Sequence, residues 1–95
     1  MKFYNKGIAA HLEAILKLLD DDHLVFENIQ GVGPIDIITV NKRNGKVSFY
    51  DAKSDRESRH KKRPQTQIQK KLGVKNFYVN LHKRTYRLEG KLGKL

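Results

Sequence analysis

Three charged residues occupy strand-like segments of the chain at positions where apolar residues are expected. Asp36 lies near the start of segment 35–41, and Asp51 and Lys53 lie near the end of segment 46–53. Because side chains two residues apart on a strand point to the same face of a sheet, Asp51 and Lys53 share a face. A carboxylate beside an ammonium group is typical of metal and phosphate chemistry, and equally of an ordinary surface salt bridge.

A tight turn between these two segments predicts how they pair. It contains Asn44-Gly45, a dipeptide that favours hairpins because both residues tolerate positive φ. With a turn over 42–45, the residue numbers of facing pairs sum to about 87. Asp36 then lies opposite Asp51 on the same face of the sheet, so the two acids are predicted to meet.

Two opposed carboxylates repel each other unless a positive group lies between them. Mg²⁺ is a suitable group, because it prefers one or two carboxylates together with water molecules and phosphate oxygens. Lys53 can contact the attacking water or the phosphate, and metal-assisted hydrolysis of a phosphodiester needs this set of groups. The alternative is a plain salt bridge in which Asp36 and Asp51 flank Lys53.

Glu13 is a further candidate for the same site. It borders the apolar stripe of the first expected helix, from which it could reach over the sheet edge toward the acids. An ordinary surface pair with Lys17, four residues further along the helix, explains Glu13 equally well.

The elements that must position these residues follow from hydrophobic periodicity and turn signals. A first helix is expected over 7–19, where an apolar stripe typical of an amphipathic helix contains Ile8, Leu12, Ile15, Leu16 and Leu19. Strands are expected over 23–29, 35–41, 46–53, 76–81 and 84–89, and a short second helix over 64–72. The final residues, GKLGKL, carry no packing signal and are expected to form a tail.

This order, α-β-β-β-α-β-β, predicts an α/β fold. A helix that crosses between two strands usually makes those strands parallel, so a mixed sheet of four to five strands flanked by helices is expected. With 95 residues, the chain is expected to form one domain. It contains no cysteine, which excludes disulfides and thiolate metal sites within it.

The net charge of +10 is unevenly distributed along the chain. Residues 1–52 contain 6 Lys and Arg against 7 Asp and Glu, whereas residues 53–95 contain 14 against 3. A basic half of this kind favours a polyanionic partner, and nucleic acid is expected ahead of an acidic membrane surface or an acidic protein. A basic ribosome-associated protein is the alternative that charge alone leaves open.

The N-terminal residues lack an apolar core of the signal-peptide type, and no apolar run approaches the roughly 18 residues that span a bilayer. A soluble, intracellular protein without membrane contact is therefore expected. Its expected location is cytoplasmic, which means the host cytoplasm if the gene is viral.

The candidate residues, in this order, resemble the PD-(D/E)XK nuclease superfamily. The resemblance rests on Glu13 in a first helix, on GPID at one strand and on DAK at the end of the next, and it covers residues 8 to about 81. The superfamily includes restriction endonucleases, archaeal-type Holliday junction resolvases, VRR-NUC nucleases and some homing endonucleases. It implies a restriction-endonuclease-like fold, with residues 1–95 as one minimal nuclease domain. The chain departs from the usual motif because Ile35 separates Pro34 from the acid.

The resemblance also implies roles for individual residues. Asp36 and Asp51 correspond to metal ligands, with the main-chain carbonyl of Ala52 as a further ligand, and Lys53 corresponds to the catalytic lysine. Glu13 corresponds to a helix-borne carboxylate that completes the metal shell in resolvases and VRR-NUC domains. Gln69 matches a glutamine of the following helix in several such families, and Gln65 and Gln67 compete with it for that role.

Basic residues near these motifs are expected to hold DNA. They are Lys61, Lys62, Arg63, Lys70 and Lys71. Contacts to phosphates position a duplex without reading its sequence; the alternative is an ordinary solvated face. The chain is therefore predicted to be a Mg²⁺-dependent DNA endonuclease, with Mn²⁺ able to substitute, and to act as a homodimer on branched or junction DNA. A homing-type or nicking endonuclease and a non-catalytic nucleic-acid-binding module of the same fold are the alternatives.

Overall fold

The structure is a computed structural model that describes residues 6–30, 33–54 and 65–95, with side chains from residue 8 onward. The elements in chain order are α1 (Lys6–Leu18), β1 (His23–Glu27), β2 (Ile37–Asn41), β3 (Val47–Ser54), α2 (Gln67–Leu72), β4 (Lys75–Asn80), β5 (Thr85–Leu88) and β6 (Lys91–Lys94). Every predicted helix and strand is present, with bounds that differ by up to three residues.

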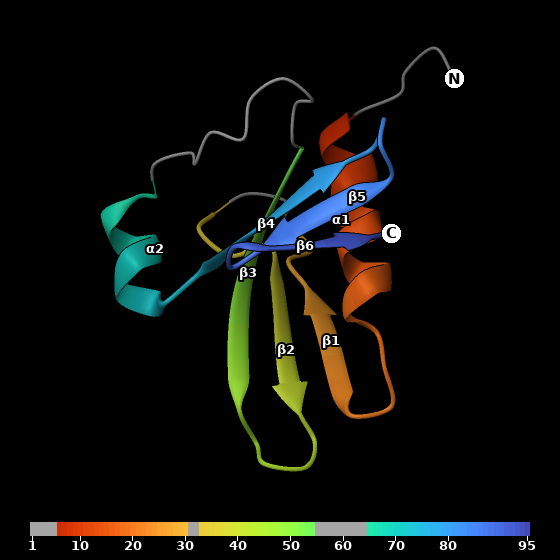
Figure 1. Cartoon of the computed structure of the whole chain (residues 1–95). Helices are drawn as coiled ribbons and strands as arrows, with labels where there is room; N and C mark the ends of the chain where they lie inside the picture. The colour runs from red at the N-terminus through yellow and green to blue at the C-terminus, as the bar shows by residue number, and fades with distance from the viewer. Residues whose placement is uncertain (1–5, 31–32, 55–64) are drawn as a thin grey trace.

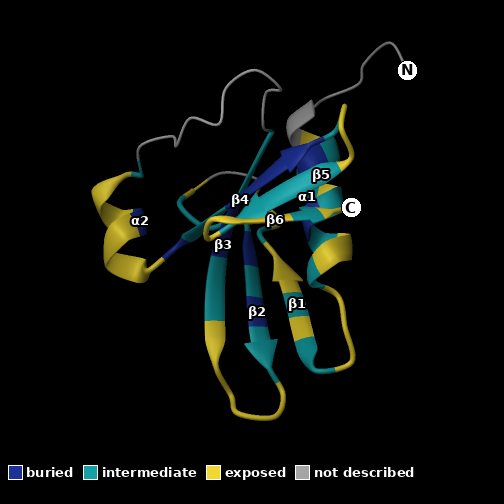
Figure 2. Ribbon diagram, in the orientation of Figure 1, coloured by how far each residue is buried: buried dark blue, intermediate teal, exposed yellow. Residues whose placement is uncertain are grey.

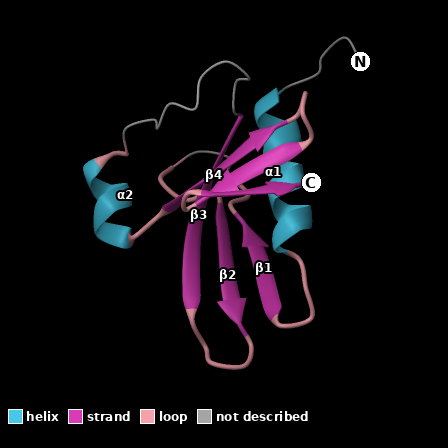
Figure 3. Ribbon diagram, viewed as in Figure 1, coloured by secondary structure: helices cyan, strands magenta, loops and turns pink. Residues whose placement is uncertain are grey.

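The six strands form one sheet in the order β1-β2-β3-β4-β5-β6 (Figure 3). The β3 and β4 strands are parallel, and the other neighbours are antiparallel. The prediction of an α/β fold with a mixed sheet flanked by helices is confirmed. Within the described residues, no helix has the length and apolar character that crossing a lipid bilayer requires.

The predicted number of strands and the predicted C-terminal tail are wrong, because residues 91–94 form β6. A two-residue turn joins β5 to β6, and both of its residues, Glu89 and Gly90, have positive φ (50° and 80°). This turn matches the twist of a hairpin. Gly93 on β6 lies under Tyr86, where a Cβ would come within 2.4 Å of the ring. The small residues that weakened the strand signal therefore let β6 pack there.

The predicted register of the hairpin is confirmed. The β2 and β3 strands pair from Ile37 with Tyr50 to Val40 with Val47. The backbone N–H of Gly45 donates to the carbonyl of Asn41 (2.8 Å), and Gly45 has a φ of 73°. The left-handed conformation of Gly45 thus closes the turn in the predicted register.

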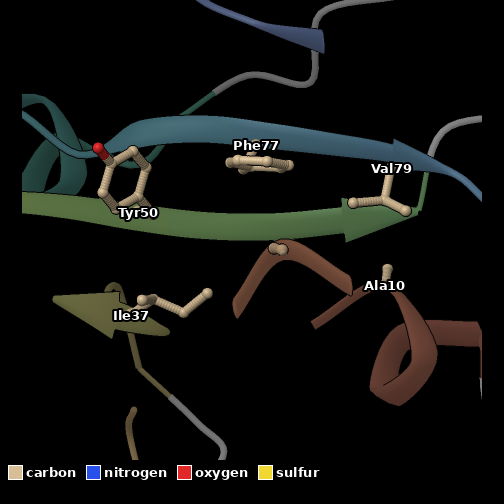
Figure 4. Close-up of a cluster of buried hydrophobic side chains, with 6 residues drawn as sticks. Ala10, Ile37, Tyr50, Phe77 and Val79 are labelled. Atoms are coloured by element: carbon tan, nitrogen blue, oxygen red, sulfur yellow. The ribbon is translucent and has the colours of Figure 1, made fainter. Parts of the chain in front are cut away.

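Helix α1 covers the face of the sheet that carries the hydrophobic core (Figure 4). The core consists of Ala10, Ala14, Ile37, Tyr50, Phe77 and Val79. The Phe77 ring stacks on Tyr86 (5.3 Å between centroids) and meets Tyr50 edge-on (6.4 Å). We call the opposite face, which carries Asp51 and Lys53, the site face.

The side of α1 that packs on the sheet is not the side that carries the predicted apolar stripe. Its fully buried side chains are Ala10 and Ala14, and Ile15 is partly buried. The remaining members of the stripe, Ile8, Leu12, Leu16 and Leu19, are 52–63% exposed. Because alanine is small, this side of the helix can approach the sheet closely. Ile15 and Leu18 pack at its border, and the other large aliphatic residues of the stripe point away from the sheet.

Helix α2 lies on the other side of the β3–β4 pair from α1 (Figure 1). It is exposed except for a short buried part (Figure 2), which the residue exposures assign to Gln69. The helix begins at Gln67, three residues after the predicted start at 64. Its position beside the C-terminal half of β3 makes it the helix that contacts the candidate site.

Candidate functional site

Asp36 lies immediately before β2 and is held by backbone groups from two neighbouring segments. Its N–H donates to the carbonyl of Tyr50 on β3 (2.9 Å), and its carbonyl accepts from the N–H of Asn28 after β1 (2.8 Å). Its carboxylate Oδ2 accepts from the N–H of Ala52 (2.9 Å). The side chain is therefore fixed against β3, next to Asp51.

Asp51 is buried, with 9% of its surface exposed. Its Oδ2 accepts from Lys53 Nζ (2.7 Å) and from Gln69 Nε2 (2.9 Å). Lys53 on β3 and Gln69 on α2 thus donate to the same carboxylate oxygen of Asp51. Directional donors on two sides leave this carboxylate little freedom to move.

The two carboxyl groups have pKa values that move in opposite directions. Burial is the larger cause and the side-chain hydrogen bond with Asp51 the second cause that together raise the pKa of Asp36 to about 6. Burial also opposes ionisation of Asp51, but hydrogen bonds from Asp36, Lys53 and Gln69 hold the pKa of Asp51 below its ordinary value. Below about pH 6 the pair therefore carries one proton, which is bound to Asp36.

At neutral pH both carboxyl groups are ionised, and Lys53 compensates only one of the two negative charges. The site then has an excess negative charge in a partly buried position, which favours binding of a cation. Two carboxylates, with water and a substrate phosphate, are enough for Mg²⁺. Asp36 and Asp51 therefore fit this ion. Ala52 lies between Asp51 and Lys53 on β3, and its N–H donates to the Asp36 carboxylate.

Gln69 is positioned by the cap of α2. Its N–H donates to Thr66 Oγ1 (3.3 Å), and its Oε1 accepts from the N–H of Thr66 (3.1 Å), which together form a capping box. Its Nε2 also donates to the carbonyl of Pro34 (3.1 Å). Gly73 ends the helix in the left-handed conformation with a φ of 69°. A six-residue helix is stable here because both of its ends are capped.

Of the three candidate glutamines, only Gln69 reaches the acids. Gln67 is exposed on α2. Gln65 donates to the carbonyl of Val74 (2.6 Å) and makes a long contact with Asn76 Oδ1 (3.5 Å). The structure thus brings together Asp36, Asp51, Lys53 and Gln69.

Glu13 is not brought to this cluster. Its Oε1 lies 2.9 Å from Nη2 of Arg84, in the turn after β4. Asn76, the β4 neighbour of Asp51, is four residues before the end of that strand, about 13 Å away along the strand. The reason is the orientation of α1: with Ala10 and Ala14 on the sheet, Glu13 faces the β4–β5 turn.

His11 is an α1 residue whose charge acts on Asp36. Its Nε2 lies 3.1 Å from Glu27 Oε2 at the end of β1. Burial dominates the pKa of Asp36, and the charge of His11 acts on that pKa in the opposite, lowering direction. Among residues 6–30, 33–54 and 65–95, no three acidic or histidine side chains lie close enough together to hold a metal ion by themselves.

The predicted DNA-contacting residues divide into two groups. Lys61, Lys62 and Arg63 lie outside the described residues. Lys70 and Lys71 are exposed in the last turn of α2, the helix that carries Gln69. Their amines are therefore presented to solvent on an element that contacts the acid cluster.

Sequence reasoning missed the continuation of the site onto β4 and β5. In the parallel β3–β4 ladder, Asn76 is next to Asp51 and Tyr78 is next to Lys53. Arg87 on β5 is next to Tyr78, with its guanidinium 4.3 Å from the ring centroid. The alternation in 75–80 already places Asn76 and Tyr78 on one face, but only the parallel register shows that this is the site face.

Comparison with known protein families, with curated proteins and with solved structures finds no match for this chain. The function is therefore argued from the geometry and chemistry of the site.

Proposed function

We propose that the protein is a metal-dependent DNA endonuclease that hydrolyses phosphodiester bonds, uses Mg²⁺ or Mn²⁺, and prefers branched DNA. The observation that carries the proposal is the pair of the partly buried Asp36 and the buried Asp51, with Lys53 Nζ 2.7 Å from Asp51. The α-β-β-β-α-β order with parallel β3 and β4 also supports a restriction-endonuclease-like fold. DNA as partner and a cytoplasmic location belong to the same proposal.

In this proposal each residue of the cluster has a defined task. Asp36 and Asp51 hold the cation, which would supply positive charge to the phosphate and lower the pKa of the attacking water. Lys53 donates from Nζ to that water or to a non-bridging phosphate oxygen, where negative charge develops. Gln69 keeps Asp51 in place through Nε2, so it is a positioning residue. Lys70 and Lys71 bind the adjacent DNA backbone.

The proposal is tested with supercoiled plasmid, linear duplex and four-way junction DNA in Mg²⁺, Mn²⁺ or EDTA. Wild type is expected to cleave the junction fastest, and Lys53→Ala and Asp51→Asn to lower the rate by about 10³-fold while binding survives. Lys42→Ala, an exposed lysine of the β2–β3 turn, removes the same charge outside the site and should cleave normally. Equal rates for wild type and Lys53→Ala would exclude the catalytic role.

A homing-type or nicking endonuclease would differ in its substrate, because it would cut linear duplex or relax plasmid without a preference for junctions. A non-catalytic nucleic-acid-binding module is favoured by one observation: Lys53 and Asp51 already satisfy each other as a salt bridge. That alternative predicts DNA binding and no cleavage in either metal.

A homodimer is part of the proposal, and the outward side of α1 supports it. Ile8, Leu12, Leu16 and Leu19 are large, aliphatic and about half exposed, opposite the buried alanines. When two such helices pack antiparallel about a twofold axis, Ile8 meets Leu19 and Leu12 meets Leu16. The surface is therefore complementary to itself, as a symmetric interface requires. A contiguous apolar stripe of this kind is uncommon on the exposed surface of a monomer.

A further inference from the structure

A groove adjoins the acid cluster on the site face of the sheet. It has a volume of about 440 Å³, and its lining includes Gln65, Asn76, Tyr78, Arg87 and Glu89. Asn76 and Tyr78 are the β4 neighbours of Asp51 and Lys53, so the groove begins one strand away, about 5 Å from the proposed reaction centre. Whatever binds there lies next to the phosphate that Lys53 would contact.

The groove is lined by a cation–π pair of side chains. The Arg87 guanidinium lies 4.3 Å from the centroid of the Tyr78 ring, and the hydroxyl of Tyr78 accepts from Asn76 Nδ2 (3.2 Å). Tyr78 is 6% exposed and Arg87 is partly exposed, so a ligand in the groove meets mainly the guanidinium group. Planar guanidinium groups held on an aromatic ring are surfaces on which unpaired nucleobases stack.

Part of the groove lining carries uncharged hydrogen-bonding groups. The side-chain amides of Gln65 and Asn76 lie side by side, with Nε2 of the first 3.5 Å from Oδ1 of the second. Asparagine and glutamine amides match the donor and acceptor pattern of a base edge. The charged part of the lining is mixed, because Lys75 and Arg87 line the groove together with Glu89, whose Oε1 lies 3.4 Å from Lys75 Nζ. These charges by themselves do not select a lone phosphate.

We propose that this groove binds one unpaired nucleotide of the DNA, with its base on the Arg87–Tyr78 pair and its edge at the Asn76 and Gln65 amides. The inference rests on the proposed nuclease function and specifies its substrate. A base inside a duplex is stacked on both sides and cannot enter such a groove. The substrate class is therefore DNA with an unpaired nucleotide beside the cleaved bond, such as a fork, a flap or an opened junction.

The test measures binding in EDTA, so that cleavage plays no part. Fluorescence anisotropy compares forked DNA with a natural single-stranded arm, forked DNA whose arm carries abasic sugars only, and fully paired duplex. Wild type is expected to bind the natural fork about tenfold more tightly than the abasic fork, because stacking of one base has this magnitude. Equal affinity of wild type for the two forks overturns the inference without any variant.

Two arginine variants of the same hairpin locate the effect. Arg87→Leu is expected to remove the difference between the natural and abasic forks while retaining duplex binding, which also shows that the variant is folded. Arg84→Leu removes the same charge from the β4–β5 turn, outside the groove lining, and should keep the difference. Gln65 lies outside the sheet, and Gln65→Ala should reduce the affinity difference between the natural and abasic forks by a smaller factor.

The outcomes separate this inference from the nuclease proposal. Cleavage in Mg²⁺ without any base preference refutes the groove and leaves the nuclease. A base preference that Arg87→Leu abolishes, with no cleavage in any metal, supports the groove and refutes the nuclease. If Arg84→Leu and Arg87→Leu weaken binding of all three DNAs equally, both arginines are phosphate contacts only and the groove is refuted.

Discussion

Helix α1 and helix α2 lie against the same sheet, but different forces fix their positions. The 13-residue α1 is held by the close, non-directional packing of Ala10 and Ala14. The six-residue α2 has a single buried side chain, Gln69, and is held by a capping box, a left-handed glycine and hydrogen bonds to Asp51 and Pro34.

The difference shows how this small domain divides its tasks. Directional hydrogen bonds define the orientation of α2, which is the helix that contacts the acids. Packing on alanine leaves the large side chains of α1 available for another surface. Substitutions at Gln69 and in the α1 stripe can therefore separate the contact of α2 with the acids from the surface that α1 presents.

Among substitutions that distinguish the two helices, the largest effect is expected from Gln69→Leu, which breaks the hydrogen bonds of α2 to the site. Asp51 and the carbonyl of Pro34 lose a donor, so we expect cleavage to fall by up to about 100-fold, as for other groups that support metal ligands. Stability should fall by about 2 kcal/mol, because buried acceptors lose their partner. Gln67→Leu makes the same change on the exposed side of α2 and should leave both quantities unchanged. Urea unfolding and junction cleavage are the measurements; normal cleavage by Gln69→Leu would contradict the positioning role.

The second prediction disturbs α1 instead. Ala14→Leu places a large side chain at a fully buried position and should destabilise the protein by about 1–3 kcal/mol through overpacking. Leu12→Ala changes the opposite side of the same helix and, at protein concentrations at which the chain is monomeric, should stay within about 0.5 kcal/mol of wild type. Chemical denaturation followed by circular dichroism measures both variants. Destabilisation by Leu12→Ala but not by Ala14→Leu would mean that α1 packs through its leucine side.

The third prediction concerns the outward stripe of α1. Leu12→Glu with Leu16→Glu should weaken self-association at least about tenfold, because two charges would enter an apolar interface. Sedimentation velocity over a concentration series measures this change. Phe26→Ser is the comparison, since Phe26 is 51% exposed on β1 as part of a separate apolar group with Leu24 and Val47. A dimer that survives the α1 variant and is lost in Phe26→Ser would place the interface on the sheet.

The smallest expected effect is a pH dependence of stability that arises at Asp36 in the acid cluster. The folded protein holds a proton on Asp36 up to about pH 6, above the ordinary carboxyl pKa of 3.8, so the folded state binds more protons between these values. The contribution of Asp36 to stability is therefore present at pH 4 and is lost as pH rises through 6. In EDTA the melting temperature should decrease by a few degrees between pH 5 and 7.5.

Two controls test the assignment of this pH response. Asp36→Asn cannot titrate at this position and should show a flatter profile. Mg²⁺ should reverse the loss at pH 7.5, because it binds the ionised pair. A decrease of the same size in Asp36→Asn would assign the pH response to another group.

Local sequence signals predicted the parts of the site that depend on short segments. The Asn44-Gly45 turn fixed the register that brings Asp36 beside Asp51. The apolar pair Ile68 and Leu72 and the following Gly73 predicted a short helix that carries Gln69, although the helix begins at Gln67, three residues after the predicted start. In both cases the determining contacts lie within a few residues, so tertiary structure had little to change.

The predictions were wrong where the structure depends on packing between segments that are far apart in the chain. The apolar stripe of α1 is a strong periodic signal, yet Ala10 and Ala14 allow closer approach to the sheet and occupy the buried side. That orientation takes Glu13 to Arg84. The β6 strand was missed because its pairing with β5, more than its own residues, stabilises it.

The sequence by itself determined the α/β order, the hairpin register and the meeting of Asp36, Asp51 and Lys53, because periodicity and turn conformation are local properties. Only the tertiary structure decided which side of α1 is buried and that Asn76, Tyr78 and Arg87 continue the site. The physical reason is that a parallel β3–β4 register and the rotation of a helix on a sheet depend on packing between segments that are far apart in the chain.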